Sequence, residues 1–395
     1  MAEDLDSKNL NIVCIGGFNY PLGMAGTQRA QFFMDRFVER KIPVKVLTIG
    51  NFGDTKEGNP GHGKKDDIEY FNLGASLPKS VFSYLAFPFI ILIAFFKIIS
   101  FKRKELKNVL YVYNSVSLDV FSILIFARLI GYKVVVDVVE DYRIIKENQS
   151  LPLVLKQKSV NFFETKIHLF CDSMIVISKY LENLFVKKLK VKVSVELIPI
   201  SMNLKVKITE KENFHSPIRI TYAGSFANKD GLQFLISAFK SFSKLYPDSE
   251  LLLAGSGNNP EKIIQESENN KIRYIGCLYG KEYQSFLTSA DILCMTRLNT
   301  KYANAGFPFK VGEYLTTGNP VIVTDVSDVS AYLENETDAK IVEPENADAL
   351  LKALIFYSTD FEKAKKIGEN GRLKALKYFN YKTNGDKLIN IMERL

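Results

Sequence analysis

Residues 299–326 read NTKYANAGFPFKVGEYLTTGNPVIVTDV, and no other stretch of the chain is as informative about its function. It predicts a Gly/Pro-shaped loop, a short helix that begins near Pro308 and contains Glu313, a turn at 317–319 and a buried strand over 320–324. A loop that leads into a helix N-terminus presents unpaired backbone N–H groups, which suit a diphosphate. A carboxylate about one turn further along can accept two hydrogen bonds from the vicinal hydroxyls of a ribose. The stretch therefore predicts a nucleotide-type ligand, and a nucleotide-sugar in particular.

Short apolar segments rich in Val and Ile alternate with helical patterns along almost the whole chain. Such segments are typical of strands that are buried on both faces. They predict two series of six strands, at 11–15, 44–49, 109–113, 134–139, 174–178 and 195–200, and at 219–223, 250–254, 272–275, 292–295, 320–324 and 340–342. Apolar residues at 30, 33, 34, 37 and 38, and at 232, 235, 236 and 239, fall on one face of a helix. The sequence thus predicts an α/β protein with two doubly wound parallel-sheet domains.

Composition supports a soluble globular protein of two domains, because the 395 residues are 47% apolar and 24% charged. A net charge of +8 without a nucleic-acid-binding motif favours an anionic substrate or an anionic membrane surface over nucleic acid. The four cysteines lie far apart, which predicts buried, reduced thiols in a cytosolic protein. The three histidines have no second ligand at a metal-binding spacing, so no metal site is expected. The polar N-terminus predicts that no secretory signal is present.

The stretch at 305–322 resembles the donor-site segment of the retaining, family-4 glycosyltransferases with the GT-B fold, in the subgroup with an FP-x-K-x-x-EYL segment. The matching positions are Phe307, Pro308, Lys310, Glu313, Tyr314, Leu315 and the strand start GNPVI at 318–322. The family usually carries another glutamate eight positions before Glu313, and this chain has Ala305 there.

The resemblance implies two Rossmann-like domains that face a central cleft. Residues 1–203 would form the acceptor-binding domain, with a helix at 380–395 packing back on it, and residues 204–379 the nucleotide-sugar-binding domain. The polar stretch 201–216 marks the boundary. The implied activity is transfer of a sugar, with retention, from a nucleoside diphosphate to a hydroxyl acceptor. The donor is a substrate, and neither a metal nor another cofactor is expected.

The second domain opens with the glycine spacing of this family, at Gly224 and Gly231. The usual arginine after the first glycine is Ser225 here, and the usual lysine before the second is Asp230, so Lys229 is expected to supply that cation. With Lys310, two lysines would neutralise the diphosphate as point charges. The expected donor-binding residues are Gly23, Ala25, Gly26, Gly224, Ser225, Lys229, Leu278, Asn304, Ala305, Gly306, Phe307, Pro308, Phe309, Lys310 and Glu313.

The loop after the first strand, FNYPLGMAGTQ at 18–28, lacks the G-x-G-x-x-G spacing of a nicotinamide site. By resemblance it is the family's first glycine loop, with Thr27 as the expected helix cap. Carboxylates follow the fourth strand at Asp137, Glu140 and Asp141. The family often has a histidine near this point, and this chain has none there. Asp137, Glu140 or Asp141 is therefore expected to assist the acceptor hydroxyl, with Lys229 and Lys310 as catalytic cations. A solvated acidic turn is the alternative.

Residues 81–96, VFSYLAFPFIILIAFF, are continuously apolar and precede a basic run. Three interpretations stay open: a membrane-spanning helix, a pair of core helices, or an interfacial patch within 80–107 that contacts anionic lipid. The family resemblance favours the patch, because many such enzymes act on lipid-linked saccharides of surface glycans. The expected location is cytoplasmic, at the inner face of the membrane.

Two other functions are compatible with the same fold. A nucleotide-sugar 2-epimerase would need carboxylates and a histidine in its cleft, and histidine is scarce in this chain. A non-catalytic relative that binds nucleotide-sugars is motivated by Ala305, which replaces the family's first glutamate.

Overall fold

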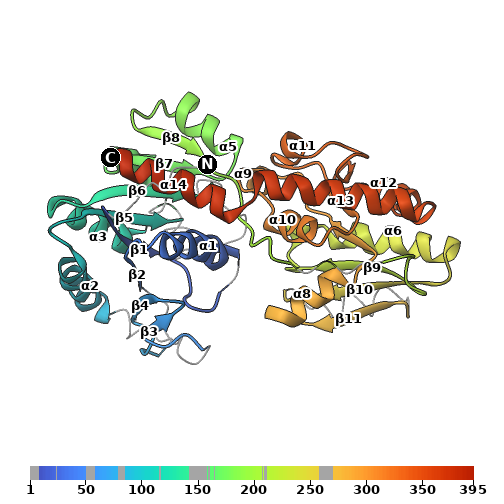
Figure 1. Cartoon of the computed structure of the whole chain (residues 1–395), viewed down its shortest axis with the longest axis horizontal. Helices are drawn as coiled ribbons and strands as arrows, with labels where there is room; N and C mark the ends of the chain where they lie inside the picture. Colours follow the sequence, from blue (N-terminus) through green and yellow to red (C-terminus); the bar gives the residue numbers. More distant parts are fainter. Residues whose placement is uncertain are drawn as a thin grey trace. The chain divides into compact units, whose positions relative to one another are not determined.

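A computed structural model describes residues 9–23, 25–49, 58–78, 85–114, 117–141, 158, 161–163, 165–206, 208, 211–257 and 270–395 (Figure 1). The chain divides into two compact units. Unit 1 comprises Met1–Ser201 and Tyr381–Leu395, and unit 2 comprises Met202–Asn380. Each unit is built on its own sheet.

The sheet of unit 1 has the strand order β3-β4-β2-β1-β5-β6-β7-β8. Every pairing is parallel except that of β3 with β4, which is antiparallel. The strands are β1 (Leu10–Gly16), β2 (Val44–Ile49), β3 (His62–Lys65), β4 (Ile68–Leu73), β5 (Lys107–Tyr113), β6 (Lys133–Val138), β7 (Ser173–Val176) and β8 (Ser194–Leu197). The central strands β1, β5 and β6 are buried almost throughout, as their Val- and Ile-rich sequences require.

The expectation of six strands in this half of the chain was wrong, because the hairpin β3–β4 adds two. The sequence of β3, HGKK, is polar, and its residues alternate between exposed and half-buried positions. β4, IEYFNL, mixes polar and apolar residues as it lies between β3 and β2. A search for continuous apolar runs misses β3 because it is a polar edge strand, and it misses β4 because Glu69 and Asn72 interrupt its apolar residues.

The helical elements of unit 1 include a helix from the far end of the chain. They are α1 (Ala25–Glu39), α2 (Phe87–Phe101), α3 (Leu118–Leu129), the 3₁₀ turn η3 (Ile167–Leu169), α5 (Lys179–Asn183), the π-helical turn η4 (Leu184–Lys188) and α14 (Tyr381–Arg394). In Figure 1, α14 (red) lies beside α1 (blue). Asp386 of α14 accepts hydrogen bonds from Arg36 at 2.7 and 2.8 Å and from Arg40 at 3.1 and 3.2 Å. The last helix is therefore part of unit 1.

Helix α2 contains most of the apolar run at 81–96, of which residues 81–84 lie outside the described part. Pro88 occupies the first turn of the helix, where its missing N–H costs no hydrogen bond, so the helix begins in the middle of the apolar run. Ile90, Ala94 and Ile98 face the core, whereas the opposite side of the helix carries exposed apolar side chains. In the part of the chain that the structure describes, no helix combines the length and apolar character needed to cross a membrane.

The sheet of unit 2 has the order β11-β10-β9-β12-β13-β14, and all of its pairings are parallel. Its strands are β9 (Ile218–Ala223), β10 (Ser249–Ala254), β11 (Ile272–Gly276), β12 (Ile292–Met295), β13 (Val321–Thr324) and β14 (Lys340–Val342). These are the six strands that the apolar segments predict. The order reverses between β9 and β12, which is where doubly wound sheets bind ligands at the carboxyl ends of their strands.

Helices cover both faces of this second sheet. They are the 3₁₀ turn η5 (Asn228–Asp230), α6 (Leu232–Leu245), α8 (Gly280–Thr288), α9 (Lys301–Ala305), α10 (Phe309–Thr316), α11 (Val329–Tyr332), α12 (Ala347–Ser358) and α13 (Phe361–Tyr378). The predicted apolar face of α6 is buried in one core together with residues of β9, β10 and α12. α9 was not expected, since residues 299–307 read as a loop.

Candidate functional site

The loop after β9 places a glycine at each end of a short polar turn. Gly231 has φ 63°, and a Cβ on it would lie 2.1 Å from the carbonyl oxygen of Thr296, so only glycine fits this position without distortion. The hydroxyl of Thr296 donates to the carbonyl of Asp230 at 2.8 Å, which ties the turn to the end of β12. The carboxyl ends of β9 and β12 are therefore held together at this edge of the sheet.

Lys310 of α10 reaches the first glycine of that loop. Its ammonium donates to Asp230 Oδ1 at 2.9 Å and to the hydroxyl of Tyr222 at 2.6 Å. A Cβ on Gly224 would lie 1.9 Å from Cε of Lys310, so the missing side chain at 224 makes room for the lysine. Burial lowers the pKa of Lys310 below its ordinary value of 10.5, and Asp230 opposes this effect. The site thus holds a cation directly over a glycine loop.

Lys229, the other expected cation, lies in the same turn. Its ammonium is 5.1 Å from the ring centroid of Tyr302, and its carbonyl accepts a hydrogen bond from Leu298. Ser225, which follows Gly224, donates its hydroxyl to Asp230 Oδ2. Ser225 and Asp230, which stand where the family has cationic residues, therefore form one hydrogen-bonded group with Lys310.

Glu313 lies on α10 one turn after Lys310, and its side chain is half-buried. The hydroxyl of Tyr283, on α8, donates to Glu313 Oε2 at 2.9 Å. Loss of solvation raises the pKa of Glu313 from 4.5 to about 7, while Tyr283 and Lys310 act in the opposite direction. At higher pH the ionised form predominates, and this form accepts further hydrogen bonds.

Tyr314, the residue after Glu313, fixes helix α10 to the end of β9. Its hydroxyl accepts from the backbone N–H of Ala223 and donates to the carbonyl of the same residue, both at 2.8 Å. Ala223 lies between Tyr222 and Gly224 in the sequence. Lys310 and Glu313 are therefore positioned by a helix that is attached directly to the strand preceding the glycine loop.

The loop at 304–309 is held by neighbouring segments of unit 2. Ser327 donates its backbone N–H to Asn304 Oδ1 at 2.8 Å and its hydroxyl to the carbonyl of Gly306 at 2.6 Å. Phe307 is buried and packs edge-on against Tyr332. Pro308 precedes α10 at its N-cap position. Ala305, at the place of the family's first glutamate, is also fully buried.

Leu278 follows β11 and is half-buried, at the same carboxyl edge of the sheet. The preceding Cys277 is exposed, and its thiol lies 3.3 Å from the carbonyl oxygen of Gly255. The prediction that all four cysteines are buried was therefore wrong at this position. The apolar run before Cys277 ends with β11, so the thiol lies beyond the strand.

The glycine loop of unit 1 packs on its own helix and strand. A Cβ on Gly23 would meet the hydroxyl oxygen of Thr27 at 1.9 Å, and one on Gly26 would lie 3.1 Å from the hydroxyl of Tyr113. Helix α1 begins at Ala25, so Thr27 lies inside the first turn and is not its cap. The Thr27 hydroxyl instead donates to the carbonyl of Asn19 at 2.7 Å and closes the loop.

Asp137 needs correction as a candidate catalytic residue. Its carboxylate is completely buried and accepts from Arg29 at 2.9 and 3.1 Å and from the hydroxyl of Tyr111 at 2.5 Å. Because these donors occupy both oxygens and no surface is exposed, Asp137 is not available to an acceptor hydroxyl. The paired arginine also removes the reason to expect an exposed carboxylate here, since a buried charge is tolerated when it is paired.

The two neighbouring carboxylates differ from Asp137 in exposure. Glu140 is half-buried after β6. Asp141 is buried and accepts a hydrogen bond from the hydroxyl of Tyr180 at 2.9 Å. Glu140 is thus the carboxylate of this group with the greater access to solvent.

Three residues near Lys310 and Glu313 were not singled out from the sequence as site residues: Tyr222, Tyr283 and Asp230. In the sequence, Asp230 is recognisable only as a departure from the family pattern, although an acid in place of a base beside a lysine indicates an ion pair. Tyr222 lies two residues before a glycine at a strand end, which is a weak signal. Tyr283 lies 30 residues before Glu313, and a single sequence contains no sign of that pairing.

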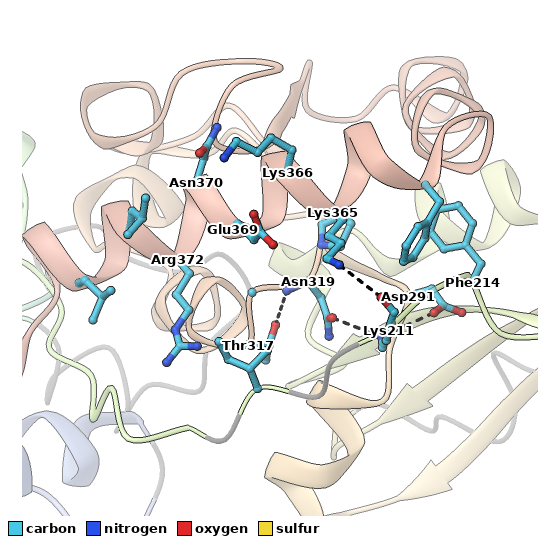
Figure 2. Close-up of a pocket in the computed structure, with 16 residues that line it drawn as sticks. Lys211, Phe214, Asp291, Thr317, Asn319, Lys365, Lys366, Glu369, Asn370 and Arg372 are labelled. Carbon is cyan, nitrogen blue, oxygen red and sulfur yellow. Dashed lines mark hydrogen bonds and ion pairs between the residues drawn. The ribbon is translucent and has the colours of Figure 1, made fainter.

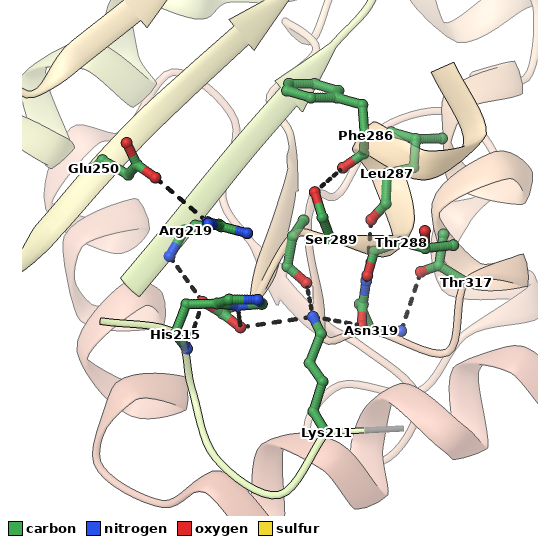
Figure 3. Close-up of polar contacts among 12 residues, drawn as sticks. Lys211, His215, Arg219, Glu250, Phe286, Leu287, Thr288, Ser289, Thr317 and Asn319 are labelled. Atoms are coloured by element: carbon green, nitrogen blue, oxygen red, sulfur yellow. Dashed lines mark hydrogen bonds and ion pairs between the residues drawn. The ribbon is translucent and has the colours of Figure 1, made fainter. Parts of the chain in front are cut away.

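A cavity of about 590 Å³ lies in unit 2 beside α13 and the segments that precede β9, β12 and β13 (Figure 2). Because the strands are parallel, this is the edge of the sheet opposite to Gly224. Asp291 accepts backbone N–H groups of His215 at 3.1 Å and Arg219 at 2.8 Å, and Lys211 lies 3.6 Å from its Oδ1 (Figure 3). This network fastens the start of β9 to the start of β12, which is a structural role.

Among the described residues, no group of three or more His, Cys, Asp or Glu side chains is arranged to hold a metal ion. The arrangement around Gly224 instead combines a lysine ammonium, a glycine loop and a carboxyl group with a raised pKa. These are groups that bind phosphates and hydroxyls. Unit 2 therefore has the features of a nucleotide-binding α/β domain.

Residues 205–374, nearly all of unit 2, match the family model described as "Glycosyl transferases group 1". This part of the chain is therefore similar to the group 1 glycosyl transferases. A galactosyltransferase of Escherichia coli, UDP-Gal:alpha-D-GlcNAc-diphosphoundecaprenol alpha-1,3-galactosyltransferase, is 26% identical over 149 residues, which are 37% of this chain and 37% of that protein. The chain matches about a third to a half of the length of its curated relatives.

Solved structures extend the likeness to both units and establish the GT-B fold. Sucrose-phosphate synthase from Thermosynechococcus elongatus has a TM-score of 0.74 at 15% identity, with 97% of this chain and 98% of that chain covered. HepE from Anabaena, in complex with UDP, has a TM-score of 0.70 at 14% identity, with 98% and 100% covered. At these identities the likeness concerns the fold alone.

Proposed function

We propose that this protein is a retaining glycosyltransferase that moves a sugar from a nucleoside diphosphate to a hydroxyl acceptor. The observation that supports this most directly is the group formed by Lys310, Gly224 and Glu313. A cation over a glycine loop suits a diphosphate, and a carboxylate one helical turn away suits the two hydroxyls of a ribose. All three lie in the domain that matches the group 1 family.

The remaining donor contacts follow from the position of each residue. Lys229, in the turn after Gly224, is proposed as a second cation for the phosphates, and Leu278, at the end of β11, as the contact of the nucleobase. The loop at 304–309 would cover the sugar, with backbone N–H groups of Phe307 and Phe309 directed to a hydroxyl or a phosphate. Gly23, Ala25 and Gly26 of unit 1 would approach the diphosphate from the acceptor side.

The proposed reaction keeps the configuration of the sugar. The acceptor hydroxyl attacks the face from which the nucleotide leaves, with a short-lived oxocarbenium-like species between the two steps. The departing phosphate takes up the acceptor proton, so a strong side-chain base is not required. Lys310 and Lys229 stabilise the charge that develops on the diphosphate, and no metal is proposed for that purpose. Because Asp137 is buried and paired with Arg29, Glu140 is the carboxylate proposed to orient the acceptor.

The donor is proposed to differ from that of relatives with two glutamates. Ala305 is buried and apolar, so one carboxylate contact with a sugar hydroxyl is missing. A deoxy-sugar or an N-acetyl sugar, which lacks or replaces a hydroxyl, would not need that contact. A screen of nucleotide-sugars by ligand-induced thermal shift identifies the base and the sugar together.

Substitution of Glu313 tests the proposed ribose contact. In Glu313→Ala, UDP or GDP binding measured by calorimetry at pH 8 is expected to weaken by roughly tenfold or more, because two charge-assisted hydrogen bonds are lost. Glu336→Ala, which removes an exposed glutamate paired with Lys340, is the control and should bind as the wild type does. Unchanged affinity in Glu313→Ala would contradict the ribose role.

Incubation with donor alone separates transfer from epimerisation, since only an epimerase produces an epimer without an acceptor.

We further propose that the acceptor is a lipid-linked or surface-glycan intermediate at an anionic membrane. The exposed side of α2 with the end of the preceding segment, here called the α2 face, consists of Leu85, Phe89, Leu92, Ile93, Phe96 and Ile99. Phe89 and Phe96 are 69% and 65% exposed. Monomeric proteins rarely expose contiguous apolar surface of this kind without a binding partner.

The charges beside the α2 face select the partner. Lys102, Arg103 and Lys104 follow the helix and are exposed, and Lys97 lies on the helix itself. An apolar face bordered by cations fits the interface of a bilayer with anionic headgroups. The name of the Escherichia coli relative includes a diphosphoundecaprenol acceptor, which supports an acceptor of the same chemical class.

Vesicle sedimentation tests this surface. The wild type is expected to bind phosphatidylglycerol vesicles, and Phe89→Ser/Phe96→Ser to bind at least tenfold more weakly, because two large apolar side chains no longer enter the interface. Leu245→Ser changes an exposed leucine of unit 2 and is the matched control. Equal binding of the double variant and the wild type would refute the α2 face as the contact. If the wild type bound neutral vesicles as well as it binds phosphatidylglycerol vesicles, the role of the cations would be refuted.

A further inference from the structure

Asp230 occupies a position in the proposed donor site where a negative charge opposes the binding of a diphosphate. Its carboxylate is nonetheless in contact with Lys310, the cation to which we assign the phosphates, at 2.9 Å. The side chains of Asp230 and Lys310 are 9% and 16% exposed. An acid at this point therefore weakens the positive potential of the loop, unless it performs a task for the lysine.

The geometry around Asp230 is rigid and directed at Lys310. Its carbonyl accepts from Thr296, its N–H donates to the carbonyl of Ala227 at 2.8 Å, and Gly231 follows in the left-handed region. Ser225 donates to Oδ2, so Oδ1 is the oxygen presented to the ammonium. With its backbone fixed on both sides and one oxygen engaged, the carboxylate has one orientation toward the lysine.

Lys310 needs such a partner because of where its side chain lies. The stem fills the space over Gly224, and Tyr222 is its other hydrogen-bond acceptor. A poorly solvated lysine without a counter-ion tends to lose its proton, and a neutral amine would not attract a phosphate. The neighbouring charges from other segments do not replace Asp230: Arg297 and Lys229 both disfavour the protonated lysine, and Glu313 itself has a raised pKa.

We propose that Asp230 is the positioning residue of Lys310: it holds the ammonium charged and directed over Gly224 while the site is empty, and a diphosphate then takes its place as the main counter-ion. The proposal rests on the proposed function for the identity of the incoming anion. The effect of Asp230 on Lys310 in the empty site does not depend on that identity.

The empty protein provides the first test. Competitive acetylation with acetic anhydride, read at Lys310 by mass spectrometry as a function of pH, reports the fraction of neutral amine. In Asp230→Asn the midpoint of this labelling is expected to fall by at least about one pH unit, a tenfold change in the protonation equilibrium. Asp230→Glu should restore the wild-type midpoint. Asp338→Asn, which removes the partner of Lys374 elsewhere in unit 2, should leave it unchanged.

Binding of nucleoside diphosphate provides the second test. Between pH 7.5 and 9 the affinity of the wild type for UDP, or for GDP where UDP gives no signal, should be constant. In Asp230→Asn it should fall by roughly tenfold over the same range, as Lys310 loses its proton. Adding Lys310→Arg, whose guanidinium does not titrate in this range, should remove the pH dependence.

The outcomes separate the two proposals. A lower labelling midpoint in Asp230→Asn supports the positioning role, and an unchanged midpoint overturns it. If the wild type binds neither UDP nor GDP, the proposed function fails, while the labelling result still decides the action of Asp230 on Lys310. Should Asp230→Asn not fold, Asp230→Ser removes the same carboxylate with a smaller side chain, and a lower Lys310 midpoint in that variant supports the proposal, whereas an unchanged midpoint overturns it.

Discussion

Each unit contains an aspartate paired with a cation near the carboxyl end of a strand, and the two pairs differ in depth. In unit 1, Asp137 and Arg29 are 0% and 2% exposed. In unit 2, Asp230 and Lys310 are 9% and 16% exposed. The first pair lies within the core, whereas the second lies beside a glycine loop.

The choice of cation matches this difference. Arg29 donates to both oxygens of Asp137 and also to the carbonyls of Ile198 and Pro199, at 2.9 and 2.6 Å. A planar guanidinium with several fixed donors suits a permanent contact, whereas the lysine ammonium is a point charge on a flexible stem that can exchange partners. A carboxylate near the carboxyl end of a parallel strand is therefore not a functional signal by itself. The cation that pairs with it and the exposure of its side chain decide whether it is available to a ligand.

The largest expected effect is the loss of the buried pair in unit 1. Arg29→Met leaves Asp137 buried without its cation and should lower the free energy of unfolding of unit 1 by about 3–5 kcal/mol. Urea denaturation of the full chain measures this. The double variant Arg29→Met/Asp137→Leu should lose less, because no uncompensated charge remains. Arg394→Met, from the exposed pair with Glu196, is the control and should change stability by less than about 0.5 kcal/mol. A loss of under 1 kcal/mol for Arg29→Met would show that the buried pair of Arg29 and Asp137 contributes no more to stability than an exposed pair.

Removing the cation of the second pair should affect binding more than folding. Lys310→Ala is expected to reduce the affinity for UDP or GDP by about 10- to 100-fold, since a charge-assisted hydrogen bond contributes about 1.5–3 kcal/mol. Calorimetry gives the affinity and thermal unfolding gives the stability. Lys374→Ala, from the pair with Asp338, should leave nucleotide binding intact. If Lys310→Ala destabilised unit 2 strongly and bound nucleotide normally, the second pair would be structural like the first.

The smallest effect concerns the pH dependence at Glu313. Its pKa is about 7 in the folded protein against an ordinary 4.5, so between these values the native state binds more protons than the unfolded chain. Stability from this group is therefore fully present below pH 4.5 and is lost as pH rises through 7. At pH 8 the free energy of unfolding of Glu313→Gln, measured by urea denaturation, should exceed that of the wild type by about 1–2 kcal/mol. The difference should vanish near pH 4.5. An equal difference at both pH values would contradict the raised pKa.

The sequence predicted the framework of unit 2 well. Its six strands are short segments rich in apolar residues, and β12 and β14 have the predicted ends. The FP-x-K-x-x-EYL segment likewise predicted the start of α10, because Pro308 ends the preceding loop and cannot lie inside a helix. Local pattern and burial agree in this domain, so the pattern is informative.

Contacts between distant segments were the part that the sequence did not reveal. Arg29 and Asp137 are 108 positions apart, and Tyr283 and Glu313 are 30 apart. Neither pairing follows a local period, so a single sequence gives no sign of which acid is neutralised. Predicting a catalytic Asp137 was wrong for this reason. The hairpin β3–β4 was missed because β3 is polar and the apolar residues of β4 are interrupted by Glu69 and Asn72.

The placement of residues 381–395 in unit 1 has a consequence for synthesis of the protein. Asp386 is attached to α1 through Arg36, and Lys107 at the start of β5 donates to the carbonyl of Glu393 at 2.6 Å. Residues 202–380 form one uninterrupted unit, whereas unit 1 is built from two segments on either side of it. Unit 1 is therefore complete only after residues 381–395 have been synthesised, later than all of unit 2.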